Sequence, residues 1–175
     1  MNNDVYLSSA KKQFQVYKSL GEKTFKQLSD EQLYWTYNSE SNSIALIVKH
    51  LWGNMLSRWT DFLISDGEKE WRNRDSEFEI DGSGKELILE RWESGWQTLF
   101  QTLESLGSED LQKEIIIRNE SLVVTDAINR QLCHYAYHIG QIVYIGKMIC
   151  NENWTSLSIP KGKSKEYNLG MLTKK

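Results

Sequence analysis

The sequence contains few of the residues that end helices or cross-link chains. Of its 175 residues one is proline and two are cysteine, against seven tryptophans and eight tyrosines. Because proline interrupts helices, this composition predicts long helices with bulky packing residues rather than a turn-rich all-β fold. Cys133 and Cys150 fall in one helical segment about 17 residues apart, too far for a disulfide, which favours two reduced thiols in a reducing compartment.

Charge and hydropathy argue against two classes of partner. The net charge is −3, whereas binding to nucleic acid needs a concentrated excess of Lys and Arg, so no nucleic-acid partner is expected. The amino-terminal segment lacks the basic start and apolar stretch of a secretory signal, and no window approaches the roughly 18 apolar residues of a membrane helix. These features predict a cytoplasmic protein without a membrane partner, folded as a single domain over residues 1–175.

Apolar residues recur three and four positions apart in four segments, which is typical of amphipathic helices. The predicted helices cover about residues 5–28, 43–65, 85–106 and 125–150. Two β-branched runs around a polar turn near residues 118–121 predict a short hairpin. The expected fold is therefore all-α, an up-down four-helix bundle with a short β-hairpin before the last helix and a surface tail over residues 155–175.

Single residues are expected to mark the helix ends. Ser41 or Ser43 can cap the second helix, because a hydroxyl can accept a hydrogen bond from the free backbone N–H groups there. Gly107 is expected to end the third helix in a left-handed conformation, and Thr125 to cap the fourth.

Two of the three histidines, His134 and His138, lie four residues apart in the last predicted helix. This spacing places two imidazoles on one helix face about 5–6 Å apart, which suits ligation of one metal ion. The third, His50, lies on a flank of the second helix that could face the last helix in a bundle. From the pattern alone a metal site and a pair of satisfied or water-bridged core histidines are both consistent with the sequence.

Further polar residues share these helix faces. Gln141 follows His138 by about one turn, where it could bond a metal-bound water or simply pack at the surface. Asn54 and Arg58 follow His50 by four and eight residues, so they could line a pocket or bind an anionic substrate. Arg58 could equally pair with a nearby aspartate.

The other residues near the histidine pair are expected to be structural. Tyr135 turns toward the apolar stripe and should pack in the core. Cys133 should be an inert, partly buried thiol rather than a ligand, because neighbours on a helix diverge by about 100°. The segment WRNRD, residues 71–75, is either a charged loop that closes over the site or a solvated connection anchored by Trp71.

Several segments together resemble the DinB/YfiT-like superfamily. They are SIALIVKHLWGNMLSRW, WRNRDSEFE, INRQLCHYAYHIGQIV and LSIPKGKSKEYN, which span about residues 43–168, and HYAYHIGQIV is the most specific. The resemblance implies an up-down four-helix bundle, often a homodimer, in which three histidines hold a divalent metal. One histidine comes from the second helix and two from an HxxxH pair on the last, which on this chain are His50, His134 and His138.

The resemblance also implies a kind of chemistry. Characterised relatives include metal-dependent thiol S-transferases and a maleylpyruvate isomerase, so a metal-dependent enzyme with a low-molecular-weight thiol or another small-molecule substrate is implied. Imidazole ligands suit several metals, and zinc or nickel is expected. Three histidines would leave a metal position open for water or a thiolate. The alternative is a non-catalytic, stress-linked or interaction protein that retains the fold, with or without metal.

Overall fold

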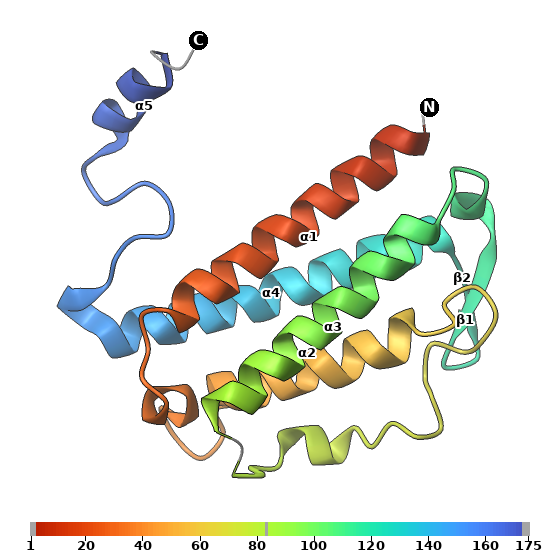
Figure 1. Ribbon diagram of the computed structural model, residues 1–175, viewed down its shortest axis with the longest axis horizontal. Coiled ribbons are helices and arrows are strands. Elements are labelled where there is room, and N and C mark those ends of the chain that lie inside the picture. Colours follow the sequence, from red (N-terminus) through yellow and green to blue (C-terminus); the bar gives the residue numbers. More distant parts are fainter. Residues whose placement is uncertain (1–2, 83, 173–175) are drawn as a thin grey trace.

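The protein is mostly helical, with one small antiparallel sheet (Figure 1). The computed structural model describes residues 3–82 and 84–172. Its α-helices are α1 (Asn3–Phe25), α2 (Ile44–Trp59), α3 (Lys85–Ser105), α4 (Val124–Cys150) and α5 (Ser164–Leu172). Its 3-10 helices are η1 (Glu31–Tyr34), η2 (Asp75–Phe78), η3 (Asp110–Gln112) and η4 (Asn151–Asn153), and its strands are β1 (Glu114–Ile117) and β2 (Glu120–Val123). None of the helices described here combines the length and the apolar character needed to span a bilayer.

The four long helices α1–α4 lie side by side, and α2 packs on both α3 and α4 while α1 packs on the same two helices (Figure 1). Helices α2 and α3 run parallel. Trp52 of α2 lies against Gly95 of α3, and seven residues later on both helices the carbonyl of Trp59 accepts a hydrogen bond from Thr102. Helices α1 and α4 also run parallel (Figure 1). Each parallel pair is antiparallel to the other.

The strict up-down order expected from the sequence is therefore wrong between α2 and α3. An alternating bundle would reverse direction at every connection, whereas the segment 60–84 returns the chain to the end where α2 began (Figure 1). A helix of 16 residues is about 24 Å long at 1.5 Å per residue, and an extended segment of this length spans that distance easily. The amphipathic pattern predicts the helices but carries no information about their direction.

Aromatic side chains from all four long helices meet in the core. Phe14, Trp59, Trp96 and Tyr135 are each at most 1% exposed. Their rings contact one another with centroids 5.8–6.3 Å apart, in tilted or edge-to-face arrangements. Full burial of an apolar side chain contributes about 1.5–3 kcal/mol, so this cluster is a major source of stability.

One of the predicted helix ends is confirmed and two are wrong. Ser43 caps α2, since its hydroxyl accepts a hydrogen bond from the backbone N–H of Leu46. Gly107 does not adopt a positive φ, and its N–H donates to the carboxylate of Asp110 instead. Thr125 lies inside α4 and its hydroxyl donates to a carbonyl of the preceding segment, because the strand β2 leads directly into the helix.

The predicted hairpin is confirmed, and its turn is tied to the connection between α2 and α3. Strands β1 and β2 pair antiparallel around Arg118 and Asn119, which both have positive φ. The backbone N–H groups of these two residues donate to the carboxylate of Asp66 at 2.9 and 3.0 Å. The hairpin and the connection 60–84 therefore lie together at one end of the helices.

The segment after α4 differs from the surface tail that was expected. Residues 158–171 are exposed, but part of them forms the helix α5. Figure 1 shows α5 standing apart from α1–α4 rather than lying on them. The last part of the predicted tail, residues 173–175, falls outside the described residues.

Candidate metal centre

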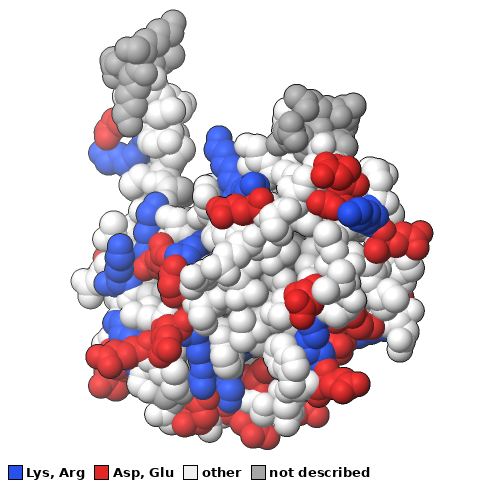
Figure 2. Space-filling model, turned by 45° about the vertical axis from the view of Figure 1, so that its right-hand side comes forward, with Lys and Arg blue, Asp and Glu red and all other residues white. Residues whose placement is uncertain are grey.

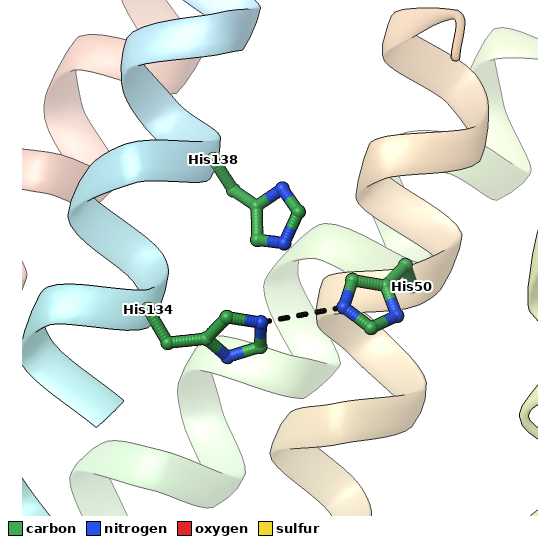
Figure 3. A group of neighbouring side chains, drawn as sticks. All are labelled: His50, His134 and His138. Carbon is green, nitrogen blue, oxygen red and sulfur yellow. Dashed lines mark hydrogen bonds between the residues drawn. The ribbon is translucent and has the colours of Figure 1, made fainter. Parts of the chain in front are cut away.

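Helices α2 and α4 bring all three histidines together (Figure 3). His50 projects from α2 toward His134 and His138 on α4, and one ring nitrogen from each lies within 4.8 Å of the others. The Nε2 atoms of His50 and His134 are 3.3 Å apart. Two nitrogen ligands on a tetrahedral ion with bonds of about 2.0–2.1 Å are about 3.3–3.4 Å apart. These three residues can therefore hold a metal ion.

Hydrogen bonds on the opposite ring nitrogens orient two of the three imidazoles. Nδ1 of His50 donates to Oε2 of Glu77 at 2.8 Å, and Nδ1 of His138 donates to Oε1 of Gln141 at 2.8 Å. A carboxylate accepts hydrogen bonds only, so the proton of a neutral His50 lies on Nδ1 and its Nε2 carries a lone pair. Metal-binding histidines are commonly held in this way.

The Nε2 atom of His138 marks the point at which the cluster could take a ligand. It is buried and has no hydrogen-bond partner among the residues that the structure describes. Buried polar atoms are nearly always satisfied, because leaving one unpaired costs free energy. Two opposed Nε2 atoms and a third without a partner are satisfied together by a cation, so the donor set fits a divalent metal.

Burial also keeps two of the imidazoles neutral. It lowers the pKa of His134 to about 3, with further lowering by the neighbouring His138 and His50. It lowers the pKa of His138 to about 4, although the hydrogen bond to Gln141 acts in the other direction. Neutral imidazole is the form that binds metal, so these two side chains are ready to bind at neutral pH.

Glu77 supports His50, a role that no pattern in the sequence indicates. Burial alone raises its pKa, but hydrogen bonds from His50 and Arg72 outweigh that effect and lower it. The guanidinium of Arg72 donates two hydrogen bonds, of 2.8 and 3.0 Å, to the same carboxylate. The carboxylate packs against Gly53 of α2, where any Cβ would overlap it. Both Glu77 and Arg72 stand in the segment WRNRDSEFE, but nothing in their spacing relates them to His50.

The connection 60–84 packs against the site, but not through the residue that was expected. Trp71 is 60% exposed, so it does not anchor the segment. Arg72 anchors it instead, with its side chain only 2% exposed. The ring of Phe78 stacks on His50 with centroids 5.0 Å apart. The guanidinium of Arg74 lies over the Phe78 ring, 5.4 Å from its centroid.

The predicted neighbours of the histidines have different roles. Gln141 contacts His138 directly. The amide oxygen of Asn54 accepts a hydrogen bond from the Tyr135 hydroxyl at 3.0 Å, so Asn54 is held by the core. Arg58 is buried and donates to Glu68 at 3.0 Å rather than to an aspartate.

Two predictions about the residues beside His134 have opposite outcomes. Tyr135 is fully buried, which confirms its expected packing role. Cys133 is exposed rather than partly buried, because it lies at the open cavity beside the histidines.

A cavity of about 370 Å³ opens beside the histidines. Both His50 and His134 line it, together with Asn54, Cys133 and Tyr137. The cavity gives a small molecule access to the imidazoles from one side, which is the arrangement that separates reactive metal sites from closed structural ones.

A family model matches residues 2–163, and its description is protein of unknown function (DUF1572). The chain belongs to the DUF1572 family. The match includes all three histidines as well as Glu77 and Gln141. Searches of curated proteins and of solved structures find no protein that matches this DUF1572 chain.

Proposed function

We propose that this DUF1572 protein is a metal-dependent enzyme of the DinB-like kind, with His50, His134 and His138 as ligands of one divalent ion. The placement of one histidine on α2 and two on α4 supports the proposal, because it is the distribution that the sequence resemblance implies. The observation that carries the proposal is the buried, unpartnered Nε2 of His138, which lies with two other imidazoles at ligand spacing.

The residues around the ligands have separate tasks in this proposal. Glu77 and Gln141 hold the Nδ1 protons of His50 and His138, so that the Nε2 lone pairs stay directed at the ion. The cavity admits the substrate on the side of His134. A bound zinc or nickel ion supplies a Lewis acid that lowers the pKa of a coordinated thiol or water.

The substrate proposed for this centre is a low-molecular-weight thiol or another small molecule. A cavity of about 370 Å³ is at the lower end of the usual range for small-molecule sites. With three protein ligands, a tetrahedral ion keeps one position for the substrate. The exposed Cys133 lies beside the cavity but is not needed for the reaction, because the thiolate comes from the substrate.

Metal content tests the ligands. The protein is purified without a nickel column and without chelator, and its metal is measured by inductively coupled plasma mass spectrometry. We expect about one divalent ion per chain, lost in His134→Ala and in His138→Ala, as three-histidine ligation requires. Cys133→Ser is the matched control, since it changes the neighbouring residue and should retain the metal. Wild-type protein without metal, or a histidine variant that keeps it, contradicts the proposal.

A cobalt-substituted protein tests the chemistry. Addition of a small thiol should change the visible absorption of cobalt if a thiolate enters the open position. The same addition to Cys133→Ser excludes the protein's own thiol as the source of the change. An unchanged spectrum in both proteins contradicts a thiolate reactant and favours water in its place.

A further inference from the structure

Five arginines surround the cavity beside the histidines. Arg58 and Arg72 are buried in its wall, whereas Arg74, Arg118 and Arg130 are exposed at its edge. They come from α2, the connection 60–84, the hairpin turn and α4, so the fold gathers them from distant parts of the chain. On the face drawn in Figure 2, by contrast, Lys and Arg residues are interspersed with Asp and Glu.

The nearby carboxylates do not neutralise this charge. Oε2 of Glu68 accepts hydrogen bonds from Arg58 at 3.0 Å and from Arg118 at 2.8 Å. The same oxygen lies 3.5 Å from Nη1 of Arg72. The single carboxylate of Glu68 therefore pairs with three guanidinium groups. The carboxylate of Glu77 pairs with only one of them, that of Arg72. A positive potential remains in the cavity.

A buried donor in the cavity wall is left without an acceptor. Nη1 of Arg72 is buried and makes no hydrogen bond to any residue in 3–82 or 84–172. The other two nitrogens of this guanidinium are fixed by Glu77, so the group cannot turn away to find another partner. Its nearest carboxylate oxygen, Oε2 of Glu68 at 3.5 Å, is shared with Arg58 and Arg118, so this guanidinium can take a further acceptor from a ligand.

Two exposed arginines at the edge are free to reach such a ligand. Within the described residues Arg74 makes no ion pair, and its guanidinium lies over the Phe78 ring. Arg130 approaches Glu120 only to 4.0 Å, and both side chains are largely exposed, so this pair holds Arg130 weakly. Arg130 precedes His134 by one turn of α4, which places it on the same side of the helix.

We infer that this cavity binds an oxyanion, the carboxylate or phosphate group of a small substrate, through Arg74 and Arg130 at its edge and Arg72 in its wall. The guanidinium fork matches the oxygens of both groups. The inference rests on the proposed function, because the anion is carried by the molecule that reacts at the three histidines. The arginines then hold the substrate while the imidazoles face its reacting group.

Isothermal titration calorimetry with the full chain tests the inference without any metal. The protein is freed of metal and then of chelator, and titrated at low salt with inorganic phosphate or with succinate. We expect one site per chain, weakened at least about tenfold in the double variant Arg74→Ala and Arg130→Ala. Added salt should weaken it further. Binding of phosphate or of succinate alone identifies which oxyanion the site takes.

Lys147→Ala is the control, because it removes a positive charge from an exposed position of the helix that carries Arg130, outside the cavity. Its affinity should equal that of the wild type. The inference is overturned if neither anion binds, or if the double variant binds as well as the wild type. Binding that needs the metal and survives in the double variant also overturns it, because the anion is then a metal ligand.

Metal content of the same variants separates this inference from the proposed function. The double variant should retain its metal, since neither arginine contacts a histidine nitrogen. Metal binding without anion binding removes the arginine site and leaves the metal centre standing. Anion binding that depends on the arginines in a protein that takes up no metal leaves the anion site standing and removes the proposed function.

Discussion

Two polar clusters lie side by side between α2 and α4, and they differ in how completely their hydrogen bonds are satisfied. In the first, Nε1 of Trp59 donates to the Tyr135 hydroxyl, which donates to Oδ1 of Asn54, both at 3.0 Å. In the second, the three histidines leave the buried Nε2 of His138 without a partner among the described residues. The Trp59 and Tyr135 donors of the first cluster are satisfied within the protein, whereas the second cluster has a place for the metal ion of the proposed function.

This difference separates a structural network from a functional one on the same pair of helices. In the network of Trp59, Tyr135 and Asn54, the indole N–H and the tyrosine hydroxyl both find acceptors. The network therefore contributes to stability and to the alignment of α2 with α4. The histidine cluster buries imidazoles whose pKa values fall to about 3 and 4, which costs folding free energy below about pH 6.5, where the unfolded chain protonates them. Changes in the first cluster should therefore affect folding, and changes in the second should affect binding.

Replacement of the largest side chain in the structural network should have the greatest effect. Trp59→Ala removes a fully buried indole and should lower the free energy of unfolding by about 3–5 kcal/mol. Denaturant unfolding followed by circular dichroism measures this. Trp71→Ala is the control, because Trp71 is 60% exposed and its loss should cost less than about 0.5 kcal/mol. Equal effects of the two substitutions would contradict the packing described for Trp59.

Metal should stabilise the wild type through the histidine cluster alone. At a free metal concentration of 100 times Kd, binding to the folded state adds about 2.7 kcal/mol of stability. His138→Ala should lose this gain, whereas Tyr135→Phe should keep it, because the tyrosine hydroxyl is not a ligand. Thermal unfolding with zinc and after chelation measures the difference, and a gain that survives in His138→Ala would break the distinction between the clusters.

Loss of one hydroxyl tests the satisfied network directly. Tyr135→Phe leaves Nε1 of Trp59 and Oδ1 of Asn54 buried and unpaired, which should cost about 1–3 kcal/mol in denaturant unfolding. Tyr137→Phe is the matched control on the same helix. The Tyr137 side chain is 54% exposed, so its variant should unfold like the wild type. If both variants unfold alike, the hydrogen-bonded chain does not stabilise the protein.

The histidine cluster should make the stability of metal-free protein depend on pH. Below the usual histidine pKa of about 6.5 the unfolded chain takes up protons at His134 and His138, while the folded protein does so only near pH 3 to 4. The unfolded state then binds more protons, so stability should fall as the pH drops from 7 toward 4. Denaturant midpoints measured with chelator present should fall less steeply with decreasing pH in His134→Ala than in the wild type. An identical dependence on pH in the two proteins would contradict the shifted pKa values.

The support of His50 by Glu77 should affect metal affinity. Gly53→Ala places a Cβ against the Glu77 carboxylate and should displace it, which should weaken metal binding about 10- to 100-fold. Gly140→Ala is the control, because open space surrounds that position on α4. Competition with a coloured metal indicator measures both affinities. Unchanged affinity in Gly53→Ala would mean that Glu77 does not orient His50.

The sequence predicted the parts of the site that lie at helical spacing and missed the parts that depend on chain direction. Residues four apart on a helix must share a face, so the spacing predicts that His134 and His138 lie together, while their role as ligands and the addition of His50 come from the family resemblance. Glu77 is 27 residues from His50 in an irregular connection, and no periodicity relates them. The parallel course of α2 and α3 was missed for a similar reason, since periodicity defines a buried face but not the direction of the helix.

The route of the connection 60–84 has a consequence for how this protein can change. Helices hold the three histidines, whereas the connection carries Glu77 and Phe78, which contact His50. It also carries Arg74, which forms part of the cavity edge. Insertions and substitutions are better tolerated in such a segment than in a packed helix. In the proposed enzyme, changes in this segment would alter the substrate preference while the helices keep the three histidines in place.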